Sequence, residues 1–320
     1  MAVPVVTRVA ECYPDTDITV LSRMQSETLW RDMPQNVHFA GADFKGRHKG
    51  ISGMQRLMQD IDYRRFDAVA DLHDVLRSLW IDRKFLMQGK KVAIIHKGRF
   101  RKWLTVNHLT GNRSLSVPML TTVQRYEAVF ARLGLVLPPD TGTLANDTPD
   151  SEKKGIGIAP FAAHKGKIYP TDKMEEVVRL LSEQLSATEE SIYLFGAGES
   201  EKSILERWEK KYKGVISLAG KYAMNEEIAI MRGLRLMLTM DSANMHLASL
   251  AGTRVLSVWG ATHPALGFLG YGQKEEDCIQ RDLPCRPCSV YGNRNCRYRD
   301  YRCLNIPPEN IAERVMQAIS

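Results

Sequence analysis

Residues Gly233–Gly260, GLRLMLTMDSANMHLASLAGTRVLSVWG, contain the pattern that decides the fold. The apolar run at 236–240 predicts a buried strand, and Asp241 and Ser242 follow it as residues that commonly begin helices. A helix-length segment comes next, and then a second β-rich run at 255–259. Parallel sheets are built from strand–helix–strand units of this kind. The stretch therefore predicts an α/β protein.

The turn between the first of these strands and the helix is the part best suited to bind a ligand. The first N–H groups of a helix have no partner within the helix and carry partial positive charge, so they suit a phosphate group. In open parallel sheets, ligands bind at the carboxyl ends of strands, which is where Asp241 lies. The alternative is that the turn is only structural, because most strand-to-helix turns bind nothing.

The composition of the whole chain limits its class. The chain has 320 residues, of which 44% are hydrophobic, enough for one large domain or two ordinary ones. It contains no apolar run long enough to predict a membrane span, and its first residues do not resemble a secretory signal. The formal net charge of +7 favours acidic partners such as phosphorylated sugars, an anionic membrane surface or nucleic acid. Charge that serves only solubility is the alternative.

Strand and helix patterns alternate along both halves of the chain. Strands are predicted at 18–21, 37–40, 66–72 and 91–96 in the first half, and at 155–160, 192–195, 215–218, 236–240 and 255–259 in the second. This alternation predicts two Rossmann-like domains with parallel sheets, at residues 1–150 and 151–320. A stretch rich in Pro, Thr, Asp and Gly at 138–151 is expected to link them.

The first predicted element is a helix, over 3–13, although a doubly wound sheet normally begins with a central strand. A sheet without its middle strand leaves backbone groups unpaired. We therefore expect that a strand and its loop precede Met1, which would be an internal methionine. An in-frame stop codon directly before Met1 would contradict this expectation.

Charged residues follow several of the predicted strands. Lys165 and Lys167 lie in a loop before a helix, where a lysine can neutralise a phosphate, and Glu199 and Glu201 follow the next strand, where a carboxylate can bind ribose hydroxyls. In the first half, carboxylate, imidazole and basic side chains at strand ends suit an anionic acceptor: Asp71, His73, Arg77, Lys97 and Arg99. The basic residues at 97–102 are expected to lie in a loop, and Asp71 is equally suited to cap the helix after it.

Five of the six cysteines lie between Cys278 and Cys303. Four of them, at 285, 288, 296 and 303, include a Cys-x-x-Cys pair that suits a tetrahedral zinc or iron site. Because the later spacings are irregular, free packed thiols or disulfides formed after lysis are the alternatives. We assign a structural zinc or iron to Cys285, Cys288, Cys296 and Cys303, and expect no cofactor to be required for catalysis.

Three segments resemble motifs of glycosyltransferase family nine, the lipopolysaccharide heptosyltransferases. FAAHKGKIYP at 161–170 resembles the family's loop containing Lys-x-Trp/Tyr-Pro. DSANMHLA at 241–248 is similar to its Asp-Ser/Thr-Gly-x-x-His-Leu/Ile-Ala motif, and VWGATHP at 258–264 is similar to its Gly-x-Thr-x-Pro segment. The resemblance covers most of the chain and departs from the family at Ala243, where the family usually has glycine.

The resemblance implies a GT-B fold, in which two Rossmann-like domains face a cleft. It implies that the C-terminal half holds a nucleotide-diphospho-sugar, with ADP-heptose favoured. Lys167 would pair with the diphosphate, and either Glu199 or Glu201 would bind ribose. The turn would offer the backbone N–H groups of three residues, Ser242, Ala243 and Asn244, and would be ordered by Asp241 and His246. The expected acceptor is an anionic lipid-linked sugar, contacted by His73, Arg77, Lys97 and Arg99.

The same resemblance raises a difficulty with the catalytic base. An inverting transfer needs a carboxylate to deprotonate the acceptor hydroxyl. In the family this aspartate follows the first strand, so its position here would lie upstream of Met1, and the given chain would be nearly inactive. Asp71 is the one substitute that the nearby sequence offers.

The resulting interpretation is an inverting glycosyltransferase that moves a heptose or a related sugar to a lipopolysaccharide core. The expected location is cytoplasmic, with peripheral contact at the inner membrane, and no nucleic-acid partner is expected. Two alternatives remain open: a GT-B nucleotide-sugar epimerase, and a noncatalytic protein that binds nucleic acid or other anions.

Overall fold

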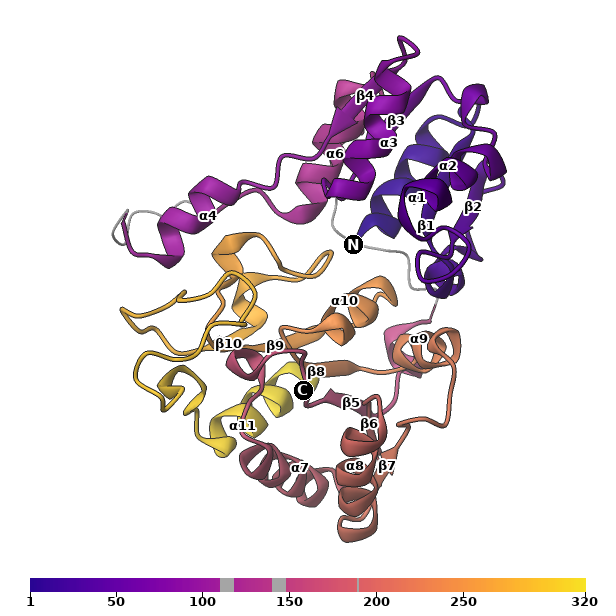
Figure 1. Ribbon diagram of the computed structural model, residues 1–320. Coiled ribbons are helices and arrows are strands. Elements are labelled where there is room, and N and C mark those ends of the chain that lie inside the picture. The colour runs from indigo at the N-terminus through magenta and orange to yellow at the C-terminus, as the bar shows by residue number, and fades with distance from the viewer. Residues whose placement is uncertain (110–117, 140–147, 189) are drawn as a thin grey trace. The chain divides into compact units, whose positions relative to one another are not determined.

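The computed structural model describes residues 1–109, 118–139, 148–188 and 190–320, and it divides into two compact units. Unit 1 comprises Met1–Lys97 and Thr122–Asp140, and unit 2 comprises Gly98–Thr121 and Thr141–Ser320. Figure 1 labels the elements of both. The segment Gly98–Thr121, which the sequence places in the first domain, therefore groups with the second. The predicted linker includes the passage between the units, and its residues 140–147 lie outside the described part.

Unit 2 is organised around a six-stranded parallel sheet with the order β10-β9-β8-β5-β6-β7. Its strands are β5 (Ile156–Ala159), β6 (Ile192–Leu194), β7 (Val215–Ser217), β8 (Leu236–Met240), β9 (Val255–Trp259) and β10 (Cys278–Gln280). Five of them confirm the strands predicted in the second half. The sixth, β10, was not predicted, because it has only three residues and lies where cysteine spacing dominates the pattern.

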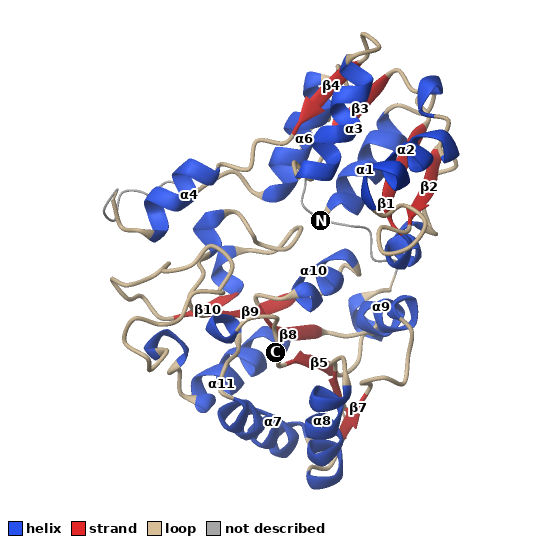
Figure 2. Cartoon of the chain, viewed as in Figure 1, coloured by secondary structure: helices blue, strands red, loops and turns tan. Residues whose placement is uncertain are grey.

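Helices cover both faces of this sheet (Figure 2). They are α7 (Thr171–Leu185), α8 (Glu199–Lys211), α9 (Met224–Arg232), α10 (Ala243–Leu250) and α11 (Pro308–Ile319). Successive strand residues point to opposite faces. Leu236 and Leu238 of β8 thus join one core cluster with α7, α8 and α11, while Met237 joins another with α9 and α10. Every residue of β8 and β9 is buried, as expected for strands covered on both sides.

The basic segment after Lys97 forms a helix, α4 (Arg99–Val106), so the prediction of a loop there was wrong. Apolar contacts stabilise this helix, and they could not be predicted from the charged residues of the segment. Val106 packs with Met119 and Leu266 of unit 2, and the Met119 N–H donates to the Ala265 carbonyl over 2.9 Å. These contacts explain why the segment groups with unit 2.

Unit 1 contains two separate parallel pairs of strands. One pair is β1 (Ile18–Arg23) with β2 (Val37–Ala42), and the other is β3 (Ala68–Asp71) with β4 (Lys91–Ile94). The helices are α1 (Ala2–Cys12), α2 (Gly50–Asp60), α3 (Leu76–Leu86) and α6 (Thr122–Arg132). The strands predicted in this half, and the helix predicted at its start, are confirmed to within a few residues. None of the described helices is long and apolar enough to cross a bilayer.

Candidate functional site

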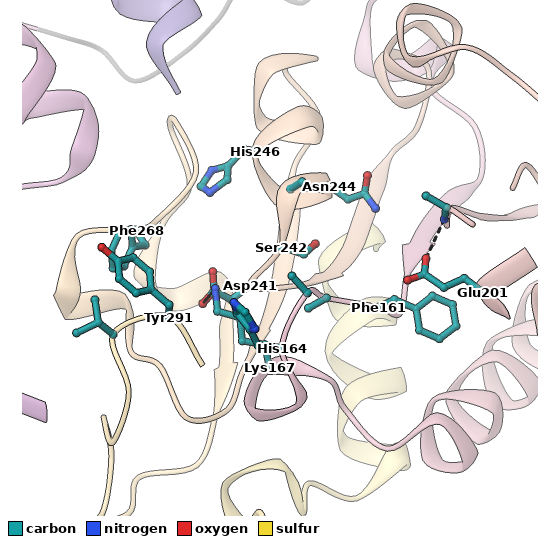
Figure 3. A pocket seen from close by; sticks show the side chains of 15 residues that line it. Phe161, His164, Lys167, Glu201, Asp241, Ser242, Asn244, His246, Phe268 and Tyr291 are labelled. Carbon is teal, nitrogen blue, oxygen red and sulfur yellow. Dashed lines mark hydrogen bonds and ion pairs between the residues drawn. The ribbon is translucent and has the colours of Figure 1, made fainter. Parts of the chain in front are cut away.

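The carboxyl ends of β5, β6 and β8 open onto a cavity of about 500 Å³ in unit 2 (Figure 3). This is the crevice in which open parallel sheets bind ligands. The residues that line it come from the loops after four strands and from the cysteine-rich segment: Phe161, Ala162, Ala163, His164, Lys167, Ala197, Glu201, Asp241, Ser242, Ala243, Asn244, His246, Phe268, Val290 and Tyr291.

Lys167 and Asp241 form an ion pair at the floor of this cavity, with 2.9 Å between the lysine Nζ and the Asp241 Oδ2. The same oxygen accepts a hydrogen bond of 2.8 Å from the Thr262 hydroxyl. Asp241 is buried, and a buried carboxylate needs partners of this kind. Asp241 therefore holds the ammonium group of Lys167 beside the first turn of α10. Thr262 was not identified from the sequence, although the segment that contains it was.

The first turn of α10 faces the cavity, because Ser242, Ala243 and Asn244 all line the cavity wall. Ser242 is the N-cap residue and has an extended backbone, with φ of −141°. Ala243 is the first helical residue and is not among the residues with positive φ. Alanine therefore fits here without strain, and its replacement of the usual glycine leaves the turn intact.

Two polar atoms in this turn lack a hydrogen-bond partner among the described residues: the hydroxyl of Ser242 and the Nδ1 of His246. Burial lowers the pKa of His246 to about 3, with a further contribution from the Lys167 ammonium. The imidazole is therefore neutral near pH 7. Unpartnered polar atoms in a cavity wall are suited to meet the polar groups of a ligand.

The two glutamates proposed to bind ribose, Glu199 and Glu201, differ in their position relative to the cavity. Glu201 lines the cavity, and its Oε2 accepts a hydrogen bond of 2.8 Å from the Ala197 N–H (Figure 3). Glu199 is exposed and does not line the cavity. The geometry thus favours Glu201 over Glu199. Gly198, between them, has φ of +80°, a conformation that residues with a side chain rarely adopt.

Aromatic side chains form one wall of the cavity, and the sequence did not identify them. The rings of Phe268 and Tyr291 lie 5.8 Å apart at their centroids. The Lys102 Nζ of α4 lies 3.9 Å from the centroid of Phe268, so α4 packs against this wall. Such a wall suits the flat or apolar part of a ligand. No motif marked these residues, because they lie on irregular segments without periodicity.

The cysteine-rich segment, residues 278–303, packs against two loops of this cavity. Arg286, which is buried, donates hydrogen bonds of 2.5 Å to the Gly260 carbonyl and 2.9 Å to the Thr262 carbonyl. A Cβ added at Gly292 would lie 2.5 Å from the Lys167 Cγ, so the segment packs directly against the lysine stem. The segment therefore fixes both the loop after β9 and the position of Lys167.

The four cysteines assigned to a metal, Cys285, Cys288, Cys296 and Cys303, are free thiols. Within the part of the chain that the structure describes, no three His, Cys, Asp or Glu side chains form a group able to hold a metal ion. As the structure places them, the four thiols do not fit such a centre. The zinc or iron site stays a prediction of the sequence, which elemental analysis of the purified protein would test.

In unit 1, Asp71 stabilises the turn after β3. Its Oδ1 accepts hydrogen bonds of 2.7 Å from the His73 N–H and 2.9 Å from the Asp74 N–H, and its Oδ2 accepts one of 3.1 Å from Asp74. The side chain is buried. These hydrogen bonds resemble the helix-capping role that was the alternative prediction for Asp71. They also occupy both carboxylate oxygens, which a catalytic base would need to receive a proton.

Three of the four residues proposed for the acceptor lie close together in unit 1. Burial lowers the pKa of His73, and the charges of Lys97, Arg23 and Arg77 contribute to the shift. Arg23 completes this basic group and was not identified from the sequence, because it ends a strand without a neighbouring motif. Arg99, the fourth residue, lies on α4 and belongs to unit 2.

Comparison with known proteins identifies the family. The model of a family described as glycosyltransferase family 9 (heptosyltransferase) matches residues 54–299. This chain belongs to glycosyltransferase family 9. It is therefore a glycosyltransferase, and the resemblance seen in its motifs is confirmed. A curated member, the lipopolysaccharide core heptosyltransferase OpsX of Haemophilus influenzae, is 24% identical over 282 residues, which are 82% of this chain and 76% of the relative.

Solved structures of family 9 members share the fold. A family 9 glycosyl transferase from Veillonella parvula matches with a TM-score of 0.70 and 16% identity, over 99% of this chain and 92% of that one. The E. coli heptosyltransferase WaaC, solved with ADP, matches with a TM-score of 0.66 and 14% identity, over 99% and 94% of the two chains. The GT-B fold expected from the sequence is thereby confirmed.

Proposed function

We propose that this family 9 enzyme transfers a heptose, or a related sugar, from a nucleoside-diphosphate carrier to an anionic lipopolysaccharide-core acceptor, with inversion at the anomeric carbon. The observation that carries the proposal is the cavity at the first turn of α10, where Lys167 is held by Asp241. The curated relative is named a lipopolysaccharide core heptosyltransferase, and one of the related structures is described with ADP. ADP-heptose is therefore the donor that we favour.

The cavity has the chemistry that a departing nucleotide requires. When the bond between the anomeric carbon and the diphosphate oxygen breaks, negative charge grows on the diphosphate. The N–H groups at the start of α10 and the Lys167 ammonium are fixed beside that position, so they stabilise the charge without reorganising. His246, neutral near pH 7, can offer a hydrogen bond without adding charge. The Glu201 carboxylate would accept hydrogen bonds from the ribose hydroxyls.

The acceptor half of the reaction is assigned to unit 1. The basic group of Arg23, His73, Arg77 and Lys97 suits phosphate or carboxylate groups on a lipid-linked sugar. The acceptor hydroxyl must also lose a proton as its oxygen attacks the anomeric carbon. Asp71 is engaged in its turn, so we assign the base to no residue of the described chain. A cytoplasmic enzyme that meets its acceptor at the inner membrane fits this assignment.

A donor panel tests the proposal. Thermal unfolding of the protein would be followed with ADP, GDP and UDP, and with the corresponding sugar conjugates. We expect ADP and ADP-heptose to raise the Tm most, and we expect transfer of the sugar to a heptose-deficient lipopolysaccharide. The absence of any nucleotide-dependent shift, or the release of an epimerised nucleotide-sugar without an acceptor, would contradict the proposal.

A further inference from the structure

The outer face of α4 carries the two largest apolar side chains of the helix, whereas its lysine is buried. Lys102 is 5% exposed, and its Nζ lies 3.9 Å from the ring centroid of Phe268. Phe100 and Trp103 face outward and are 73% and 50% exposed. A helix on a protein surface normally exposes its charged side chains and buries its apolar ones. Contact with water alone therefore does not account for the outer face of α4.

The two exposed rings form one apolar unit. Phe100 and Trp103 are stacked, with 6.3 Å between the ring centroids and 19° between the ring planes. They lie three residues apart, a spacing that places side chains on the same side of a helix. Leu109, shortly after the end of α4, is 60% exposed. Neighbouring exposed apolar side chains of this kind mark interaction sites, whereas single scattered ones do not.

The segment 290–302 lies beside α4 and extends the same surface. Arg294 donates a hydrogen bond of 3.3 Å to the Oδ1 of Asn107, the residue at which α4 ends. Val290 packs in one apolar cluster with Val106 of α4. Two tyrosines of the segment are also exposed, Tyr291 and Tyr298. We call residues 99–109 and 290–302 of unit 2 the aromatic–basic surface.

Much of the positive charge of the chain lies on this surface. Its 24 residues contain seven Lys or Arg and one Asp, while the whole chain has a formal net charge of +7. Asp300, the one carboxylate, forms an ion pair of 2.8 Å with Arg302. The exposed cationic side chains are Arg99, Arg101, Arg294, Arg297, Arg299 and Arg302. Charge complementarity therefore requires a partner with many negative charges.

We propose that the aromatic–basic surface docks unit 2 on an anionic lipid bilayer, with the rings of Phe100 and Trp103 among the headgroups and the arginines against lipid phosphates. Aromatic side chains next to basic ones are typical of elements that lie in the membrane interface. Each basic side chain near an anionic bilayer adds to the attraction. A bilayer also covers the exposed aliphatic side chain of Leu109, which a nucleic-acid backbone does not.

The surface adds a location to the proposed function. It rests on that function in one respect only, namely that the acceptor is lipid-linked and lies in the same layer. The exposure of the rings and the concentration of charge do not depend on the donor or on the reaction.

Vesicle sedimentation tests the proposal on the full chain and two double variants. The vesicles consist of phosphatidylcholine alone or of phosphatidylcholine and phosphatidylglycerol in equal parts. Phe100→Ser with Trp103→Ser removes the rings and keeps every charge, and neither residue lines the donor cavity. Leu76→Ser with Leu86→Ser, which removes two exposed apolar side chains of α3 in unit 1, is the matched control. The Tm of each variant, with and without ADP, shows whether it is folded.

We expect the parent chain to bind the anionic vesicles about 10-fold or more tighter than the neutral ones, and less tightly at high salt. Phe100→Ser with Trp103→Ser should weaken this binding by about 10-fold or more. The control should change it by less than about twofold. In the parent chain, anionic vesicles should slow hydrogen exchange in peptides that cover α4 and not in peptides that cover α8. This last measurement requires no variant.

The absence of vesicle binding, equal binding by the parent chain and the Phe100→Ser/Trp103→Ser variant, or unchanged exchange in α4 would each overturn the proposal. Binding of single-stranded DNA in place of vesicles would assign the surface to nucleic acid, and self-association abolished by the same substitutions would assign it to a second copy of the chain. Either result would also overturn it. Loss of the nucleotide-dependent rise in Tm would refute the proposed function alone, because vesicle binding requires no nucleotide.

Discussion

Replacing Lys167 by methionine should weaken ADP binding strongly, whereas replacing Lys165 by methionine should not. Lys167 lines the cavity and is held at 2.9 Å from Asp241, so its charge is fixed beside the first turn of α10. Lys165 is exposed, does not line the cavity and lies 5.4 Å from the ring centroid of Tyr301. Methionine keeps most of the apolar stem in both variants, so the comparison isolates the ammonium group.

The expected magnitude follows from the environment of the lysine. Lys167 is only 16% exposed at its side chain, and a hydrogen bond from a charged donor in such a position contributes roughly 1.5–3 kcal/mol. Lys167→Met should therefore raise the Kd for ADP by about 10- to 150-fold. Lys165→Met should change it by less than about twofold. Isothermal titration calorimetry measures both, and the Tm of each variant shows whether Asp241, which keeps Thr262 as a partner, still folds correctly.

If folded Lys167→Met binds ADP as tightly as the parent chain, Lys167 does not contact the diphosphate. Equal weakening of ADP binding in the two variants would also contradict this role, since the effect would then reflect general surface charge. In that case the dependence on salt concentration would also be the same for both.

Three further predictions concern other parts of the structure. Burial raises the pKa of the Asp82 carboxyl to about 7, so this group stays protonated in the folded state while it ionises in the unfolded chain. The free energy of unfolding should therefore fall by about 3 kcal/mol between pH 4 and 7, and urea unfolding of Asp82→Asn should show a much smaller fall. Glu201→Ala should remove the preference for ADP over 2′,3′-dideoxy-ADP, which competition binding measures; an unchanged preference would exclude a ribose role for Glu201. Arg286→Ala should leave the Gly260 and Thr262 carbonyls without their donor and lower the free energy of unfolding by roughly 3 kcal/mol, and an unchanged urea midpoint would contradict this.

The sequence predicted the parts of the fold that have strong periodicity. The run at 236–240 and the N-cap pair after it identified β8, α10 and the turn between them, because strand burial and helix capping act locally. The family motifs then selected Lys167 and Asp241, which the structure brings to 2.9 Å.

The remainder depended on tertiary contacts. The helix α4 was predicted as a loop because its charges suggested solvent, whereas Val106 is buried against Leu266, far away in the sequence. Phe268 and Tyr291 meet only through irregular loops, which carry no periodic signal. The choice between Glu199 and Glu201 required the three-dimensional course of one turn, because both residues follow the same strand.

A crystal structure of the protein with ADP tests the central claim most directly. We expect the diphosphate to lie against the first turn of α10, within hydrogen-bond distance of the backbone N–H groups of Ser242, Ala243 and Asn244 and of the Lys167 ammonium. A diphosphate bound elsewhere on unit 2, with Lys167 still paired only to Asp241, would contradict it.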